Sequence, residues 1–144
     1  MAQESTSVMD DSFRQVYEEL AEEHRGLVDL VARIRAHREV IGLAPMIEDL
    51  HALLIRHFSR EQFPGGLYER MGAYGSRYHA ELKVLVEEHC TILSSVRGIL
   101  ERIRGTRRAD EAVLLGDVRD VLDRLGDHER REHTLAEKLL GLGR

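Results

Sequence analysis

The chain contains very little cysteine, proline or aromatic residue. Among its 144 residues there are one cysteine, two prolines and no tryptophan, and aromatic residues make up 5%. The single thiol, Cys90, has no partner for an internal disulfide, so nothing in the sequence requires an oxidising compartment. With so few rings available, the core must be built mainly from Leu, Val, Ile and Ala.

Long apolar runs and an excess of positive charge are also missing. No apolar segment approaches the roughly 20 residues that a membrane-spanning helix needs. The first residues, 1–11, are polar and acidic and lack the hydrophobic centre of a signal peptide. The formal net charge is −5, whereas phosphate contacts need a basic face. We therefore expect a cytoplasmic protein with neither a membrane nor a nucleic acid as partner.

Hydrophobic periodicity predicts four long helices. Apolar residues recur at helical spacing in four segments, which are about 10–12 to 41–42, 44–62, 76–104 and 110–140. Residues 67–75 suggest a short helical turn followed by a loop around Gly72 and Gly75. We expect an all-α, antiparallel up-down-up-down four-helix bundle made of residues 12–144, preceded by a flexible terminus of residues 1–11. On the first helix, the expected inward stripe is Phe13, Tyr17, Leu20, His24, Leu27, Val28 and Val31.

A histidine pattern occurs twice along the chain. A lone histidine is followed, on the next helix, by a histidine and a glutamate four residues apart, and four-residue spacing puts both on one helical face. The six residues are His24, His57, Glu61, His89, His128 and Glu132. All fall on apolar stripes, where a carboxylate costs several kcal/mol unless it is paired or bound to a metal. The pattern therefore predicts a site for two transition-metal ions.

The position of these residues along their helices agrees with a shared site. Each histidine stands near the middle of its expected helix, and an up-down bundle brings the middles together. For one His–Glu pair alone, a surface contact is the simpler interpretation; for the whole set, the alternative is a coincidence of core histidines. The remaining histidines are expected on the surface or at a stripe edge, and they are His37, His51, His79 and His133. Cys90 is turned about 100° from its neighbour His89 and is not expected to bind metal.

At these residues the chain resembles the hemerythrin-like (HHE cation-binding) family. The segments that carry the resemblance are Glu22-Glu23-His24-Arg25, His57-Phe58-Ser59-Arg60-Glu61, Glu87-Glu88-His89 and His128-Glu129-Arg130-Arg131-Glu132-His133. The resemblance spans residues 12–141 and implies an antiparallel four-helix bundle. It also implies a non-haem di-iron centre of the four-His, two-Glu type, with both glutamates bridging two iron ions (Fe2+/Fe3+) beside an oxo or hydroxo group. The same ligand types also suit zinc or manganese, so the metal stays open.

The sequence departs from the oxygen-carrying hemerythrins on two helices. Those proteins have a His-x-x-x-His pair on the third helix and a bridging aspartate on the fourth. Here Leu93 follows His89 by four residues, and Glu132 replaces the aspartate. The ligand set is more similar to bacterial di-iron proteins implicated in repair of iron centres and in nitric oxide or peroxide handling. The cysteine-containing amino-terminal segment of some repair proteins is missing. With two histidines and two shared glutamates each, the irons would be equivalent and open, which favours reducing a ligand over carrying it.

Two functional classes stay open at this point. The first is an enzyme that reduces or disproportionates nitric oxide, hydrogen peroxide or dioxygen, with electrons from an unidentified donor. The second is a non-catalytic sensor of oxygen, nitric oxide or iron, an oxygen binder, or an iron donor. Tyr17 lies two turns before His24 and is expected in the outer shell of the site, or else as a core tyrosine at the bundle end. Candidate acceptors for the second imidazole nitrogens are Glu22, Glu23, Glu87 and Glu88. The sequence leaves monomer and dimer open.

Overall fold

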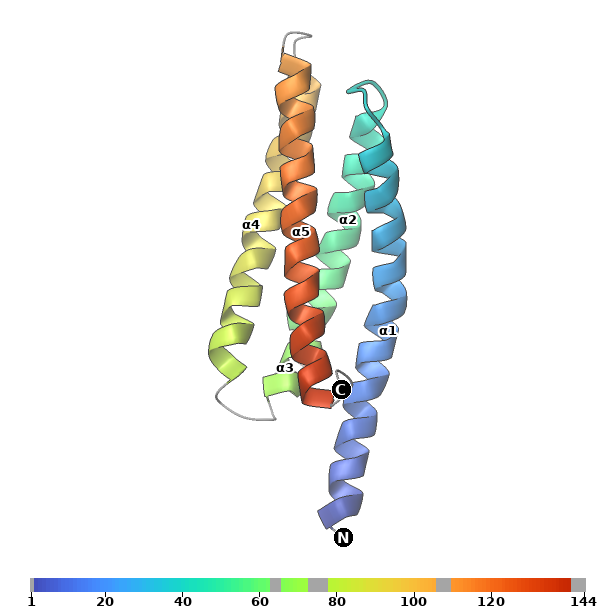
Figure 1. Cartoon of the computed structure of the whole chain (residues 1–144), viewed down its shortest axis with the longest axis vertical. Helices are drawn as coiled ribbons and strands as arrows, with labels where there is room; N and C mark the ends of the chain where they lie inside the picture. Colours follow the sequence, from blue (N-terminus) through green and yellow to red (C-terminus); the bar gives the residue numbers. More distant parts are fainter. Residues whose placement is uncertain (1, 63–65, 73–77, 106–109, 141–144) are drawn as a thin grey trace.

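The protein is a bundle of four long helices. The computed structural model describes residues 2–62, 66–72, 78–105 and 110–140. The long helices are α1 (Ala2–Ala36), α2 (Leu43–Gln62), α4 (His79–Gly105) and α5 (Glu111–Leu140), and a short helix, α3 (Leu67–Gly72), lies between α2 and α4. In Figure 1 the chain ascends along α1 and α4 and descends along α2 and α5. No strand occurs in the described ranges, so the predicted all-α four-helix bundle is confirmed.

Helix α2 shows how the sequence produces these elements. Pro45 stands in its first turn, where the fixed φ of proline suits a helix and no backbone hydrogen bond is lost. Leu50, Leu54 and Phe58 follow at four-residue spacing, and all three are buried. Burying one such side chain stabilises the fold by about 1.5–3 kcal/mol, so this face fixes the helix against the bundle.

Helix α1 differs from its predicted bounds at both ends. It begins at Ala2, about ten residues early, and Figure 1 shows its first part extending beyond the other helices. It ends at Ala36 because His37 turns the chain: the His37 amide bonds the carbonyls of Arg33 and Ile34, both at 3.1 Å. A ring nitrogen of His37 bonds the carbonyl of Ile41 at 2.6 Å. Gly42 then adopts a φ of 80°, a left-handed conformation that favours glycine.

The inward stripe of α1 is narrower than its predicted form. Val28 was expected on it, but its side chain is 52% exposed, whereas Leu30 and Ile34 are buried. Leu20, Leu27 and Ile34 repeat every seven residues, which is the spacing of a bundle seam. Val28 lies one residue past that seam and therefore faces solvent. The expected loop around Gly75 falls outside the described residues, and the domain boundary at residue 12 stays a prediction.

The core consists of two apolar clusters with a polar layer between them. The larger cluster includes Leu27, Phe58, Ile92 and Leu125. The smaller cluster consists of Leu20, Leu67, Tyr68, Met71, Tyr78, Leu82, Leu85, Leu135 and Ala136. On α1, α4 and α5, the predicted metal ligands stand between members of the two clusters. The bundle therefore holds those ligands at one level, with apolar packing on both sides.

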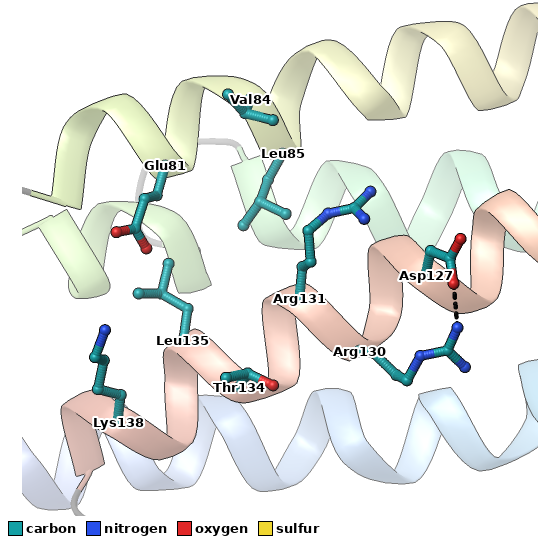
Figure 2. Close-up of a pocket in the computed structure, with 9 residues that line it drawn as sticks. All are labelled: Glu81, Val84, Leu85, Asp127, Arg130, Arg131, Thr134, Leu135 and Lys138. Carbon is teal, nitrogen blue, oxygen red and sulfur yellow. Dashed lines mark hydrogen bonds and ion pairs between the residues drawn. The ribbon is translucent and has the colours of Figure 1, made fainter.

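The outer faces of the bundle carry surface grooves. One groove of about 510 Å³ lies between α4 and α5, and Figure 2 shows Arg131 extending from α5 toward α4 across it. None of the six predicted ligands lines this groove. Within the described ranges, no helix combines the length and the apolarity needed to cross a bilayer.

Candidate metal centre

The structure brings five of the six predicted ligands into one buried cluster. Two groups of four side chains place their ligand atoms within 4.8 Å of one another. One group consists of Glu61, His89, His128 and Glu132, and the other consists of His57, Glu61, Glu129 and Glu132. Glu61 and Glu132 belong to both groups. The cluster therefore has two halves that share two carboxylates: a first half that contains His57 and a second half that contains His89 and His128.

His24, the sixth predicted ligand, stands at the edge of the cluster. Its side chain is 36% exposed, and its Nε2 lies 3.5 Å from a carboxylate oxygen of Glu129. Its ring is stacked on that of His57, with 6.3 Å between the centroids. His24 thus belongs to the half that contains His57, on the solvent side.

The two oxygens of Glu61 face different halves of the cluster. Oε2 lies 3.3 Å from Nε2 of His57, and Oε1 lies 3.2 Å from Nε2 of His89. On the opposite side, Oε2 of Glu132 lies 3.7 Å from Nε2 of His128. A carboxylate with one oxygen toward each half has the arrangement that bridging two ions requires.

Each of the three buried histidines forms a hydrogen bond through Nδ1, on the side of its ring that faces away from the centre of the cluster. Nδ1 of His57 donates to Glu23 at 2.9 Å, and Nδ1 of His128 donates to Glu88 at 3.0 Å. Nδ1 of His89 donates to the side-chain oxygen of Gln62 at 2.6 Å. Each bond places a ring proton on Nδ1 and turns Nε2 toward the centre, where it presents a lone pair whenever the ring carries no second proton. Such partners orient metal-binding histidines and fix their tautomer.

The two halves of the chain build this support in the same way. Glu23 directly precedes His24, yet it serves His57 on α2, and it also accepts from Arg60 at 2.6 Å. Glu88 directly precedes His89, yet it serves His128 on α5 and also accepts from Arg131. Each outer glutamate thus serves the histidine of the next long helix. Of the four expected acceptors, Glu22 and Glu87 make no such bond among the interactions described.

Polar atoms without a hydrogen-bonding partner show that the donor set fits a metal. The buried atoms with no such partner include Nε2 of His57 and of His128, both oxygens of Glu61, and Oε1 of Glu129. Buried polar atoms are rarely left in this state. Imidazole nitrogens and carboxylate oxygens together are donors that suit iron and related ions. The residues present therefore fit a pair of metal ions.

In the half of the cluster that contains His57, the side chains bind protons that a metal cation can replace. Burial raises the pKa of Glu61 well above its ordinary value, and the nearby Glu132 and Glu129 raise it further. Burial alone would lower the pKa of His57. The carboxylates Glu129, Glu132 and Glu23 outweigh burial and raise that pKa to about 8. A metal ion supplies the positive charge that these protons otherwise provide.

The second half contains a histidine that stays neutral. Burial, together with His128 and His57, lowers the pKa of His89 to about 2. The Tyr68 hydroxyl lies 2.9 Å from Nε2 of His89 and donates to Glu132 at 2.5 Å. One phenol hydrogen cannot satisfy both acceptors, so a lone pair remains at this position for a cation.

Comparison with known families agrees with this geometry. The model of the hemerythrin HHE cation-binding domain matches residues 15–139, which include every residue of the cluster. The chain belongs to the hemerythrin HHE cation-binding family. The resemblance noted in the sequence is thereby confirmed, and HHE domains bind metal ions, typically iron. Comparisons with curated proteins and with solved structures give no match.

This HHE domain places two further side chains in the centre that the sequence analysis did not include. Glu129 is 8% exposed and belongs to one of the two ligand groups. A signal for it was present, because Glu129 lies four residues after Leu125 and seven after Leu122, both buried on the α5 seam. Tyr68 comes from α3, a segment too short for periodicity to orient. With both present, the two halves are not equivalent, unlike the symmetric pair expected from six ligands.

A small cavity reaches the HHE centre beside the first half. It has a volume of about 90 Å³ and is lined by Tyr17, Leu20, Ala21, His24, His57, Leu67, Glu129, Glu132 and His133. The Tyr17 hydroxyl is hydrogen bonded to Nδ1 of His133. Burial, with Glu137 and Glu132, raises the pKa of Tyr17 to about 12, so the phenol stays protonated. Cys90 is exposed and belongs to neither ligand group.

Proposed function

We propose that this HHE domain is a non-haem di-iron protein that binds small oxidants and reduces or disproportionates them. The ions would be held by His24 and His57 in one half and by His89 and His128 in the other, with both glutamates of the repeated pattern, Glu61 and Glu132, shared. The observation that carries the proposal is the pair of ligand groups with two carboxylates in common. An iron pair held in this way can supply two electrons to one bound molecule.

The cavity limits the substrate to a very small molecule. A volume of about 90 Å³ is far below the roughly 300–1,000 Å³ of sites for drug-sized ligands. It is ample for dioxygen, nitric oxide or hydrogen peroxide, since a water molecule occupies about 30 Å³ in the liquid. Leu20, Ala21 and Leu67 form the apolar part of its wall. These dimensions support a diatomic or peroxide ligand.

Protons for such a reduction can come from the chain itself. Tyr17 lines the cavity, its hydroxyl bonds Nδ1 of His133, and Nε2 of His133 lies 2.7 Å from a carboxylate oxygen of Glu137. The side chain of His133 is 56% exposed, so this chain of hydrogen-bonding groups connects the cavity to solvent. Reducing peroxide to two waters consumes two electrons and two protons, and Tyr17 stands where a proton is needed.

One observation favours the alternative of an iron sensor or iron donor. His24 is 36% exposed, and it lines a groove of about 450 Å³ between α1 and α5 together with Glu129. A ligand that solvent can reach allows its ion to exchange. The second candidate function is therefore a protein whose outer ion is released or sensed.

Anaerobic stopped-flow mixing of the diferrous protein with hydrogen peroxide or nitric oxide tests the proposal. We expect both irons to be oxidised in each turnover, with repeated turnover when a chemical reductant is present. The Tyr17→Phe variant should keep its iron and react more slowly with peroxide. Tyr78→Phe, which changes a buried tyrosine that does not line the cavity, is the matched control. A stable, reversible dioxygen adduct and no peroxide turnover would contradict the redox proposal.

A further inference from the structure

Glu129 is a third buried carboxylate within the HHE centre. Its Oε2 lies 3.5 Å from Nε2 of His24, and its Oε1 lies 3.5 Å from Nε2 of His57. Oε1 is buried and has no hydrogen-bonding partner. The residue is 8% exposed. Its carboxylate is therefore directed at the same two nitrogens that would hold an ion in the first half.

The internal repeat of the sequence shows that the half of the cluster that contains His89 and His128 has no counterpart of this carboxylate. Glu129 directly follows His128, as Phe58 directly follows His57. Each of these residues faces the lone histidine of the other half of the chain. Phe58 stacks on His89 with 3.8 Å between ring centroids and 7° between planes, whereas Glu129 faces His24. At equivalent positions of the repeat, His89 therefore faces an aromatic ring and His24 faces a carboxylate.

Among the ion pairs of the described residues, none joins Glu129 to an arginine. The arginines described nearby pair with other acids: Arg60 with Glu23, Arg131 with Glu88 and Arg130 with Asp127. Ligand oxygens of Glu129, Glu61 and Glu132 lie within 4.8 Å of one another. Three carboxylates this close repel one another strongly when desolvated. A bound cation removes that repulsion.

We infer that Glu129 is a seventh protein ligand and that it binds the ion held by His24 and His57. The inference rests on the proposed di-metal function and deepens it. One ion then has two imidazoles and three carboxylates, whereas the other has two imidazoles and two carboxylates beside Phe58 and Tyr68. The two positions are chemically different, and the carboxylate-rich position suits hard ions such as Mn2+ and Fe3+. The added carboxylate also lies on the cavity wall, where it narrows access to that ion.

The test compares wild type, Glu129→Gln and the control Asp120→Asn, which removes an exposed acid from the same helix. Anaerobic Fe2+ titration gives the affinity and stoichiometry, and Mössbauer spectra of the 57Fe-loaded proteins report each iron separately. Wild type should bind two ions and show two distinct iron environments of equal area. Glu129→Gln should lower the affinity for one ion by at least about tenfold, which is the lower bound for loss of a supporting residue. The affinity for the other ion should stay unchanged. Asp120→Asn should behave as wild type.

Thermal unfolding separates a ligand from a merely structural residue. If Glu129 binds an ion, the increase in Tm that saturating Fe2+ gives wild type should be smaller in Glu129→Gln. The shorter carboxylate of Glu129→Asp should retain part of the affinity, which provides a second variant if the glutamine protein does not fold. A Glu129→Gln protein with two wild-type affinities, unchanged spectra and an unchanged Tm increase overturns the inference alone. A wild type that binds no pair of ions overturns the proposed function as well.

Discussion

At the scale of single residues, the buried histidines depend on carboxylates that reach them from a neighbouring helix. Glu23 holds His57 from α1, and Glu88 holds His128 from α4. Hydrogen bonding and charge from Arg60 and His57 lower the pKa of Glu23 against the opposing effect of its partial burial. Glu23 therefore stays ionised at neutral pH and can accept the Nδ1 proton of His57. That proton places the ring in the orientation that the site needs.

Removing this support should weaken metal binding without removing a ligand. We predict that Glu23→Gln lowers the affinity for Fe2+ by about tenfold to a hundredfold, the usual effect of losing such a partner. Glu22→Gln changes the exposed neighbour and should leave the affinity unchanged. Competition with a chromophoric chelator measures both variants. Equal affinities for the two variants would show that Glu23 does not position His57.

Metal affinity should also depend on pH in a defined direction. In the metal-free protein the pKa of His57 is raised to about 8, so below that pH a proton occupies the nitrogen that the ion needs. The ion must displace this proton. Because the pKa of Glu61 is also raised, the ion must displace a second proton from that carboxyl group. Apparent affinity for Mn2+ should therefore increase by about tenfold or more per pH unit between pH 6 and 8 and increase less steeply above pH 8, where His57 no longer carries the second proton. Titrations across this range that show no slope would contradict the assignment.

Sequence reasoning was strongest where periodicity and chemistry coincide. His57, Glu61, His89, His128 and Glu132 were chosen because polar residues on an apolar stripe need a reason, and the structure brings them together. Tyr17 lines the cavity together with His24 and His57, and its place in the outer shell of a metal site stays a prediction. Glu129 was missed because the neighbouring His128 satisfied the pattern, although Glu129 also lies on the seam. Tyr68 could not be predicted, because only tertiary packing directs α3 toward the centre.

At the scale of helices, sequence predicts the middles better than the ends. Helix α2 was predicted over residues 44–62 and runs from Leu43 to Gln62, because its apolar residues keep the helical spacing along its whole length. The end of α1 was placed too late, because Val40 and Ile41 continue the apolar pattern after the helix has stopped. What ends the helix is the set of bonds made by His37 and the left-handed Gly42, which no periodic pattern contains.

The first part of α1 provides a prediction at this scale. Figure 1 shows it extending past the other helices, so no other helix of the described ranges lies beside this part of the backbone. Deleting residues 2–11 should change the free energy of unfolding by less than about 0.5 kcal/mol and leave the metal content unchanged. Leu20→Ala, at a buried position further along α1, should cost about 2–5 kcal/mol. Urea denaturation compares the two, and a large loss on deletion would mean that the extension makes contacts that hold the bundle.

At the scale of the whole molecule, the bundle holds a polar layer between two apolar clusters. Four helices each contribute to that layer, and an outer glutamate on α1 and on α4 supports the histidine of the following long helix. The two halves of the chain repeat this plan and differ at the residue that follows the histidine of α2 and of α5. Glu129 and Phe58 occupy equivalent positions with opposite chemistry, and the cavity opens beside the half that contains Glu129.

The central claim is that the two halves of this layer each hold one iron and share two carboxylates. The most direct measurement is anomalous diffraction at the iron edge from crystals of the iron-loaded protein. We predict two peaks, one beside His24 and His57 and one beside His89 and His128, each in contact with Glu61 and Glu132. A single peak, or peaks away from these residues, would contradict the account.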